Sequence, residues 1–355
     1  MINDFVFNKI KNVEGISEWR SPSNIALIKY WGKKENQIPL NSSLSITLSK
    51  CFTQTKLTYR PKINNEKDFT FLFEGVENIS FEPKLSQFFK RIEKYCPYLN
   101  YLQLKIESRN SFPHSSGIAS SASAYSALAL CIMDIEKKIN PQLDEKFFLK
   151  KASFLARLGS GSASRSVIGS FSIWGESKHF EKSTDLFAIK YSDQVHKIFN
   201  DICDTVLIVD KNKKEVSSTV GHQLMDNHSF SFGRLAQAEN NMGLLKNALK
   251  NGNYDSFIEL VELEALTLHA MMLTSKPYFI LIKPNTLEII SLIWNYRKKN
   301  LSKVCFTLDA GANIHLLYPK REFIKIQEFI KNELSIFCDS NRFINDRIGN
   351  GPFKL

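Results

Sequence analysis

Apolar and polar positions in the first third of the chain follow a pattern that is typical of short β-strands. The apolar runs are rich in β-branched and aromatic residues, and turn residues separate them. The pattern predicts strands at 24–31, 44–50, 53–60, 69–73 and 102–108.

Later segments repeat their apolar residues with the period of an α-helix. Phe147, Phe148, Phe154, Leu155 and Leu158, for example, fall on one helical face. Helices are predicted at 143–158, 230–250, 254–273 and 287–299, and strands at 205–210, 303–308 and 313–318. A glycine turn at 251–252 is expected to end the second helix.

Strands and helices mix without regular βαβ alternation, which favours an α+β fold. The 355 residues suggest two domains of about 150 residues each, and we predict them at 1–195 and 196–355. No run approaches the ~20 apolar residues of a membrane span, so no membrane association is expected. The six cysteines are far apart, without a CxxC or His/Cys cluster, which fits a reducing cytoplasm better than a disulfide framework.

The chain is basic, with 47 Lys and Arg residues against 36 Asp and Glu and a net charge of +11. Such a surplus suits either nucleic acid or an anionic small molecule. The lysines are scattered and no nucleic-acid-binding motif accompanies them. We therefore expect no nucleic-acid partner, and a solvated basic surface whose field would favour an anionic small-molecule substrate.

A serine-rich segment at 113–124 leads directly into an apolar helical pattern at 125–135. Small residues let the backbone approach a ligand closely, and the free N–H groups at a helix start attract phosphate. The segment lacks the Walker pattern GxxxxGK[ST]. It fits a phosphate cradle or a serine-capped helix packed on a sheet, and local composition does not decide between them.

Two other segments place one charged residue among small ones. Arg165 lies within 159–166, where its planar guanidinium would suit bidentate binding of a carboxylate or phosphate; an exposed turn is the alternative. Asp309 follows a hydrophobic run and precedes a glycine turn, where aspartate commonly serves the turn itself. Near the N-terminus, Lys29-Tyr30-Trp31-Gly32-Lys33 alternates cationic and aromatic side chains.

Together these segments resemble one family, the mevalonate diphosphate decarboxylases, within the superfamily of galactokinase, homoserine kinase, mevalonate kinase and phosphomevalonate kinase. The matching segments are 23–33, 41–45, 117–122, 159–166, 216–219 and 309–311, and their order and spacing agree from about residue 20 to 320. Segments 29–33 and 159–166 are specific to the decarboxylase branch, whereas the glycine–serine loop marks only the superfamily.

The resemblance implies a two-lobed fold with the active site between the lobes and a nucleotide-binding N-terminal lobe. It also implies ATP-dependent decarboxylation of (R)-5-diphosphomevalonate to isopentenyl diphosphate, ADP, phosphate and CO₂. ATP with Mg²⁺ and a homodimer are further implications of the family. Mg²⁺ is expected to arrive with the nucleotide, and no protein ligand is assigned to it.

Residue roles also follow from the resemblance. Asp309 would face the 3-hydroxyl group, Lys29 would lie beside it, and Arg165, oriented by Asn24, would hold the substrate carboxylate. The other implied substrate-binding residues are Tyr30, Trp31, Gly32, Lys33, Ser160, Gly161, Ser162, Ala163, Ser164, Thr219 and Lys84. The residues implied for the ATP phosphates are Gly117, Ala119, Ser120, Ser121 and Ser123.

Four departures from the family pattern stand out. His114-Ser115 replaces a usual Thr-Ala before the glycine–serine loop. Ala312 replaces a common proline, which would loosen the turn that aims Asp309; Ser164 replaces a common cysteine, a change expected to be silent. His222 replaces a frequent methionine and is the departure that could alter substrate choice, although a packing or surface histidine is the simpler interpretation.

Other functions stay open at this point. A decarboxylase of 5-phosphomevalonate would use the same catalytic residues, although Tyr30 and Lys33 favour the diphosphate. A mevalonate 3-kinase is less consistent with the retained aspartate–lysine pair. A non-catalytic ligand-binding regulator should have lost catalytic positions, and Asp309, Lys29 and Arg165 are all present.

Overall fold

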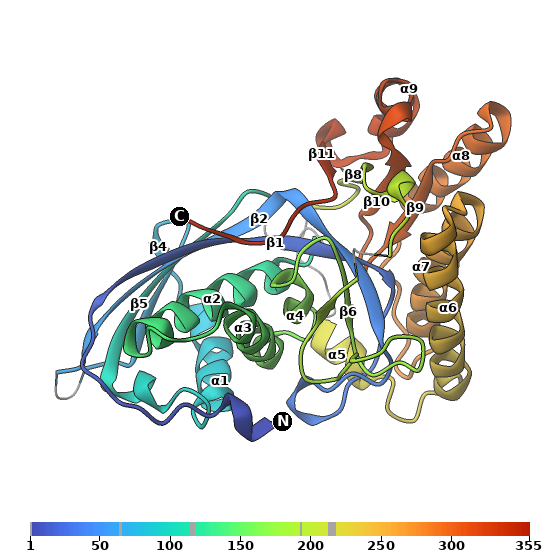
Figure 1. Cartoon of the computed structure of the whole chain (residues 1–355). Helices are drawn as coiled ribbons and strands as arrows, with labels where there is room; N and C mark the ends of the chain where they lie inside the picture. Colours follow the sequence, from blue (N-terminus) through green and yellow to red (C-terminus); the bar gives the residue numbers. More distant parts are fainter. Residues whose placement is uncertain (1, 64–65, 114–117, 192–193, 212–217) are drawn as a thin grey trace.

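The computed structural model describes residues 2–63, 66–113, 118–191, 194–211 and 218–355. It combines two β-sheets with helices packed against them (Figure 1), which confirms the predicted α+β class. The division at residue 195 stays a prediction.

The first sheet has the strand order β12-β1-β2-β5-β3-β4, and β6 and β7 extend it beside β2. Its strands are β1 (Gly15–Ile28), β2 (Ser43–Pro61), β3 (Phe69–Phe73), β4 (Val76–Glu77), β5 (Leu102–Asn110), β6 (Phe171–Trp174), β7 (Ile189–Lys190) and β12 (Phe353–Lys354). The two strands predicted at 44–50 and 53–60 are one continuous strand, β2. The prediction divided it because Ser49 and Lys50, which are exposed, interrupt the alternation of apolar residues.

Four helices pack against one side of this sheet (Figure 1): α1 (Glu82–Ile92), α2 (Ser120–Ile139), α3 (Glu145–Gly159) and the short α4 (Ala163–Ser166). The core between them includes Leu57 and Ile106 from the strands and Leu130 and Phe154 from the helices, all almost fully buried. Helix α1 was not predicted, although Leu85, Phe88 and Ile92 give it a buried apolar face.

The second sheet has the order β11-β8-β10-β9. Its strands are β8 (Ile202–Leu207), β9 (Cys305–Leu308), β10 (Ile314–Pro319) and β11 (Phe343–Arg347). The helices of this half are α5 (Ser218–Gln223), α6 (Ser231–Asn251), α7 (Tyr254–Leu273), α8 (Pro284–Asn300) and α9 (Phe323–Phe329). Helix α6 ends as predicted at Gly252, whose φ of +71° is the left-handed conformation that favours glycine.

One of the hydrophobic clusters joins the two sheets. Ile25 and Leu27 of β1 belong to the same buried cluster as Val206 of β8 and Val261 of α7. The end of β1 is therefore held firmly against the second half of the molecule, and this contact positions the candidate site.

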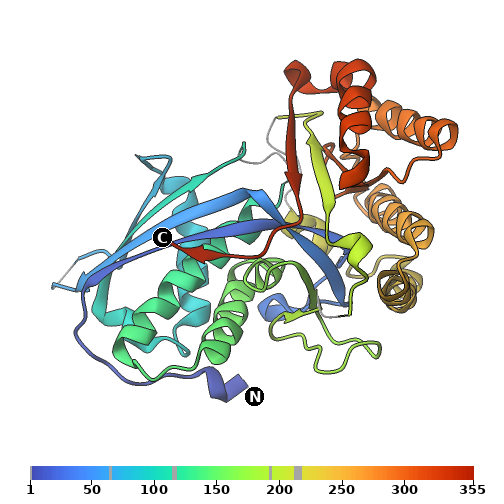
Figure 2. The same ribbon diagram turned by 45° about the horizontal axis from the view of Figure 1, so that its top comes forward.

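The C-terminal segment connects the two halves a second time. After β11, the chain returns to the first sheet, where β12 pairs with β1 (Figure 2). Near the end of β11, Asp346 accepts hydrogen bonds from the backbone N–H groups of Ser49, Lys50 and Cys51, at 2.7–2.9 Å. The last residues of the chain are thus part of the N-terminal sheet.

Two other findings concern the whole chain. In the part of the chain that the structure describes, no helix combines the length and apolar character needed to cross a membrane. All six cysteines are buried, and none forms a disulfide.

Candidate active site

Lys29 and Asp309 form an ion pair where the two halves of the molecule meet. Each residue directly follows a buried strand, Lys29 after β1 and Asp309 after β9. The Lys29 Nζ lies 2.9 Å from Asp309 Oδ1, with the lysine side chain only 2 % exposed and the aspartate 27 % exposed. The pair is therefore buried on the lysine side and accessible on the carboxylate side.

The surroundings of Lys29 act on its charge in opposite directions. Burial lowers the pKa of Lys29 below its usual value, while the carboxylates of Asp309 and Glu264 act to raise it. The backbone carbonyl of Asp309 lies 3.0 Å from Nε2 of His269, which anchors the residue to α7. Asp309 is thus held at both its backbone and its side chain.

Arg165 is a fully buried cation with neutral hydrogen-bond partners. Its Nε and Nη2 donate to Oδ1 of Asn24, at 3.3 and 3.2 Å, and its Nη1 donates to the Ser43 hydroxyl. The Asn24 amide in turn donates to the Ser162 carbonyl and the Ser166 hydroxyl. Burial lowers the pKa of Arg165 to about 10.

A buried charge with neutral partners is costly, so this arrangement favours an anionic ligand. Among the described residues, no carboxylate forms a salt bridge with Arg165, although Asp309 is close enough to affect its pKa. Arg165 also lies over the rings of Tyr30 and Trp174, 5.7 and 5.9 Å from their centroids. These contacts join Lys29, Asp309, Arg165 and Tyr30 into one cluster.

His222 packs inside this cluster rather than on the surface. Its ring stacks on Tyr30 with centroids 4.6 Å apart, and it also contacts Trp31. Its Nδ1 accepts a hydrogen bond from the Gly32 N–H at 3.0 Å. Burial and the nearby Lys33 lower the pKa of His222 to about 3, so the ring is neutral and carries its proton on Nε2.

Tyr30 and Lys33 differ in how their surroundings affect their protonation. Burial raises the pKa of Tyr30 to about 12, so its hydroxyl is a neutral hydrogen-bond donor. The Lys33 Nζ is 2.8 Å from Oε1 of Gln37, and burial followed by the positive charge of Arg91 lowers the pKa of Lys33. An anion would relieve the repulsion between Lys33 and Arg91.

The segment around α4 brings its small residues against this cluster. A Cβ added at Gly161 would lie 2.6 Å from Trp174 and 2.9 Å from the Tyr30 hydroxyl. Ser160 lies beside Ser121, with their hydroxyl oxygens 3.2 Å apart. Ala163 is buried, and the Ser164 hydroxyl donates to the Gly161 carbonyl, so Ser164 supports the turn from within.

The start of α2 presents only part of the predicted phosphate cradle. Ser121 is exposed and Ser120 is half-buried, whereas Ser123 is fully buried and its hydroxyl lies 2.6 Å from that of Thr53. Ala119 precedes the helix with a φ of +46°. The predicted Gly117 lies outside the described residues.

Two predicted substrate residues are not placed at the cluster. Lys84 is an exposed residue of α1, and only its carbonyl has a described contact, with the Tyr125 hydroxyl. Thr219 belongs to α5, but its side chain lies outside the described structure.

The departure at Ala312 has a structural compensation. The Ala312 carbonyl accepts a hydrogen bond from the Thr286 hydroxyl at 2.8 Å. The side chain of Asn313 bonds both the N–H and the carbonyl of Asp210, at 2.9 and 3.0 Å. Hydrogen bonds to α8 and to the segment after β8 therefore hold the turn after Asp309 in place without the proline.

Sequence reasoning missed the residues that hold the Lys29 backbone. The Asn41 amide donates to the Lys29 carbonyl at 3.0 Å, and its Oδ1 accepts from the Trp31 N–H. Glu264 and Arg234 also bond the backbone of Lys29. Asn41 was part of a matching segment, but no local signal pointed to the other two.

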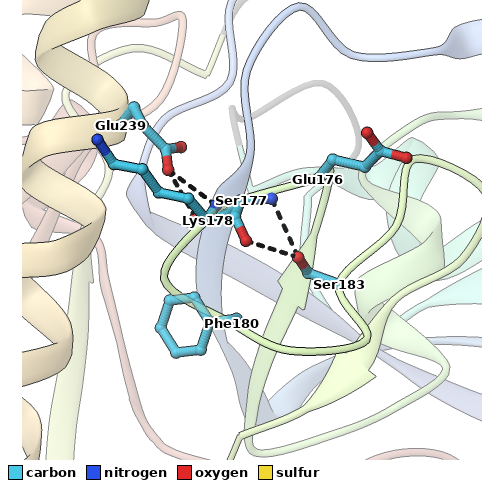
Figure 3. Close-up of a pocket in the computed structure, with 6 residues that line it drawn as sticks. All are labelled: Glu176, Ser177, Lys178, Phe180, Ser183 and Glu239. Carbon is cyan, nitrogen blue, oxygen red and sulfur yellow. Dashed lines mark hydrogen bonds between the residues drawn. The ribbon is translucent and has the colours of Figure 1, made fainter.

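A separate surface hollow lies between the loop after β6 and helix α6 (Figure 3). It is lined by Glu176, Ser177, Lys178, Phe180, Ser183 and Glu239. Glu239 accepts hydrogen bonds from the Ser177 hydroxyl and the Lys178 N–H, at 3.0 and 3.1 Å. The hollow contains none of the predicted site residues. The Glu239 carboxylate connects the loop after β6 to α6.

Comparison with known proteins identifies the family. Residues 21–186 match the model of the diphosphomevalonate decarboxylase-like N-terminal domain, and residues 205–350 match that of the mevalonate 5-diphosphate decarboxylase C-terminal domain. The diphosphomevalonate decarboxylase of Saccharomyces cerevisiae is 30% identical over 326 residues, covering 87% of this chain and 79% of that protein.

Solved structures agree over nearly the whole chain. The mevalonate diphosphate decarboxylase of Staphylococcus aureus aligns with a TM-score of 0.82 at 29% identity, covering 97% of this chain and 98% of that one. A structure of MDDEF in complex with MVAPP, AMPPCP and magnesium aligns with the same TM-score at 28% identity, covering 97% and 99%. The chain belongs to the diphosphomevalonate decarboxylase family.

Proposed function

We propose that the cluster around Lys29, Asp309 and Arg165 carries out the reaction of this family. That reaction is the ATP-dependent decarboxylation of (R)-5-diphosphomevalonate to isopentenyl diphosphate, ADP, phosphate and CO₂. The observation that carries the proposal is the Lys29–Asp309 ion pair next to a buried arginine with neutral partners. This arrangement provides a carboxylate, a fixed cation and an anion-binding guanidinium in one place.

The chemistry explains why these three groups are needed together. A tertiary 3-hydroxy acid does not lose CO₂ readily, because hydroxide is a poor leaving group. When the 3-hydroxyl oxygen takes the γ-phosphoryl group of ATP, ADP is released and the oxygen becomes part of a good leaving group. The electrons of the breaking C–C bond then form the double bond, and phosphate and CO₂ leave.

In this scheme Asp309 faces the 3-hydroxyl group. Its partly exposed carboxylate would orient the hydroxyl and accept its proton, while Lys29 keeps the carboxylate ionised. Phosphoryl transfer through a loose transition state needs little early proton removal, so positioning by the pair contributes as much as basicity. The Lys29 ammonium also offsets the negative charge that develops beside it.

Arg165 binds the substrate carboxylate in the same scheme. Asn24 and Ser43 occupy parts of the guanidinium and fix its plane, which prepares it for an anion without neutralising it. Tyr30, Lys33, Ser160 and Ser162 are proposed for the diphosphate, together with Thr219 and Lys84. Trp31, Gly32, Gly161, Ala163 and Ser164 shape the surface on which these groups lie.

The nucleotide is proposed to bind at the start of α2. The Ser120 and Ser121 hydroxyls and the free N–H groups of this 20-residue helix suit phosphate oxygens. Among the described residues, no three His, Cys, Asp or Glu side chains gather as a metal site. We infer that Mg²⁺ reaches the site on the ATP phosphates and offsets their charge there.

The test is a product assay with Mg²⁺-ATP on mevalonate, 5-phosphomevalonate and 5-diphosphomevalonate, in which ADP and CO₂ are both measured. Equal amounts of ADP and CO₂ on the diphosphate alone are expected. Turnover mainly on the monophosphate would contradict the diphosphate assignment, and ADP without CO₂ would make the protein a 3-kinase. Silence on all three substrates would support a non-catalytic regulator.

We also propose a homodimer that works in the cytoplasm. Light scattering of the purified protein tests the first point, and imaging of a tagged copy tests the second. A monomer at micromolar concentration would contradict the dimer.

A further inference from the structure

We propose that Glu264 and Arg234 are a positioning pair that holds the backbone of Lys29 and so aims its ammonium group at Asp309. The inference rests on the proposed function, because it concerns the same lysine. It adds one residue of α6 and one of α7, whose described bonds to this ion pair go to the Lys29 backbone.

The pair itself is completely buried. Arg234 of α6 and Glu264 of α7 both have side chains that are 0 % exposed. The two Nη atoms of Arg234 donate to the two carboxylate oxygens of Glu264, at 2.9 and 2.6 Å. Asn241, two turns further along α6, adds a third donor at 2.7 Å.

The same two side chains bond both polar backbone groups of Lys29. The Lys29 N–H donates to Oε2 of Glu264 at 2.9 Å, and Nη2 of Arg234 donates to the Lys29 carbonyl at 2.8 Å. The chain leaves β1 at Ile28, so Lys29 has no strand partner for these groups. A buried backbone needs such partners, and here side chains from the other half of the molecule supply them, together with the Asn41 amide at the carbonyl.

The orientation of the Arg234 guanidinium favours the hydrogen bond to the Lys29 carbonyl over the use of all its donors. Its Nε is buried without a described partner, while Nη2 serves both Glu264 and Lys29. An arginine placed only to neutralise Glu264 could use Nε and one Nη side-on. The observed geometry instead extends one Nη to the lysine carbonyl.

The same helix contains a natural comparison. Glu262 of α7 forms its own two-pronged pair with Arg297 of α8, at 2.5 and 3.0 Å. Glu262 also accepts from the Trp294 indole, and its described bonds do not involve Lys29. The two glutamates, two residues apart on α7, therefore form similar pairs with an arginine, and the pair that contains Glu264 bonds Lys29.

Glu264 also affects the charge of Lys29. In the part of the chain that the structure describes, the charged and titratable groups around Lys29 include Asp309, Glu264, Arg165, Arg234, Asp204 and Tyr30. Glu264 acts to raise the pKa of Lys29 against the effect of burial. Removing its negative charge should lower this pKa further, so the protonated lysine should be lost at a lower pH.

The experiment compares Glu264→Gln with the matched control Glu262→Gln in the full-length protein. For Glu264→Gln we expect kcat to fall roughly 10- to 100-fold because the lysine is misplaced, with the KM for ATP close to that of the wild type. The alkaline limb of kcat/KM should move to lower pH. Glu262→Gln should lose similar stability in urea while it keeps the kcat and pH profile of the wild type.

Each other outcome is informative. A folded Glu264→Gln variant with the kcat and pH profile of the wild type would overturn the proposal, as would equal losses of kcat in both variants. If Glu264→Gln does not fold, Arg234→Lys keeps the buried charge but cannot bond Glu264 and Lys29 in the same geometry. A folded Arg234→Lys variant should then show the loss of kcat, and normal kcat would contradict the inference.

The failure of this inference is distinguishable from failure of the proposed function. A wild type that releases no CO₂ from the diphosphate refutes the function, and the inference with it. An active wild type whose Glu264 and Arg234 variants behave normally refutes the inference alone.

Discussion

At the scale of single residues, the contrast between Asp309 and Arg165 defines what the site can bind. The Asp309 carboxylate is partly exposed and already has a cationic partner, whereas Arg165 is buried among neutral groups. A ligand that brings both a hydroxyl and a carboxylate would use the first group for the hydroxyl and the second for the carboxylate. Loss of either residue should therefore give a different kinetic signature.

Asp309→Asn should lower kcat by about 10³-fold, because the amide neither accepts the hydroxyl proton nor pairs with Lys29 as an anion. ATP affinity should stay close to that of the wild type. The rate of CO₂ release measures the change in kcat, and a titration with nucleotide measures the ATP affinity. Near-normal turnover in this variant would remove Asp309 from the role of base or orienting group.

Arg165→Gln should lower kcat/KM for the organic substrate by about 100-fold or more, because a buried charge that meets the carboxylate is lost. Asn24 and Ser43 would also lose their partner. Initial rates at varied substrate and fixed saturating ATP measure this effect. If ATP binding collapsed instead while CO₂ release persisted, Arg165 would belong to the nucleotide.

The sequence predicted those site residues that lie in a recognisable local motif. Lys29, Arg165 and Asp309 lie in recognisable segments, and the structure brings them together. Their assignment to substrate stays a prediction. Glu264 and Arg234 could not be predicted, because each lies in an ordinary helical pattern and acquires its role only from a contact more than 200 residues away.

At the scale of elements, the glycines around α4 determine how closely the chain can approach Tyr30. Gly161 faces Trp174 and the Tyr30 hydroxyl with no room for a side chain. By contrast, a Cβ at Gly233, in the first turn of α6, would meet no atom within 4 Å. The two positions give a matched pair of substitutions.

Gly161→Ala should raise the KM for the phosphorylated substrate about 10-fold, because Tyr30 or Trp174 must shift to admit the methyl group. Gly233→Ala should leave KM unchanged and should stabilise the protein by up to about 0.5–1 kcal/mol. Steady-state kinetics and urea unfolding give both quantities. Unchanged kinetics for Gly161→Ala would mean that the loop has more freedom than its packing indicates.

Element boundaries were predicted best where the pattern was long. Helix α7 was predicted with its observed bounds, and α6 to within one residue at each end. Helix α1 and strands β11 and β12 were missed. The two strands are short and mixed in polarity, and tertiary pairing with β8 and β1, rather than their own composition, makes them strands.

At the scale of the whole molecule, Asp346 links the C-terminal segment to the first sheet through one side chain. One carboxylate satisfies three consecutive backbone donors of β2 at the place where that strand presents exposed residues. Its removal would leave several of these N–H groups without a protein partner. The effect should appear in global stability rather than in chemistry.

Asp346→Asn should lower the free energy of unfolding by about 2–3 kcal/mol, because the charge-assisted bonds to Ser49, Lys50 and Cys51 are weakened. Lys354→Ala, which removes a half-exposed partner of Asp134, should cost less than about 1 kcal/mol. Urea unfolding of both variants measures the difference. Equal small losses would mean that the connection contributes little to holding the halves together.

The pairing of β12 with β1 also determines when the first sheet can be finished during synthesis. Trp19 and Arg20 pair with Lys354 and Phe353, which are made 335 and 333 residues later in the chain. At about 5–20 residues per second, the edge of β1 waits on the order of tens of seconds for its partner. Throughout that interval the edge of β1 is unpaired. The charged side chains of Glu18 and Arg20 on β1 would disfavour pairing of this edge with other nascent chains.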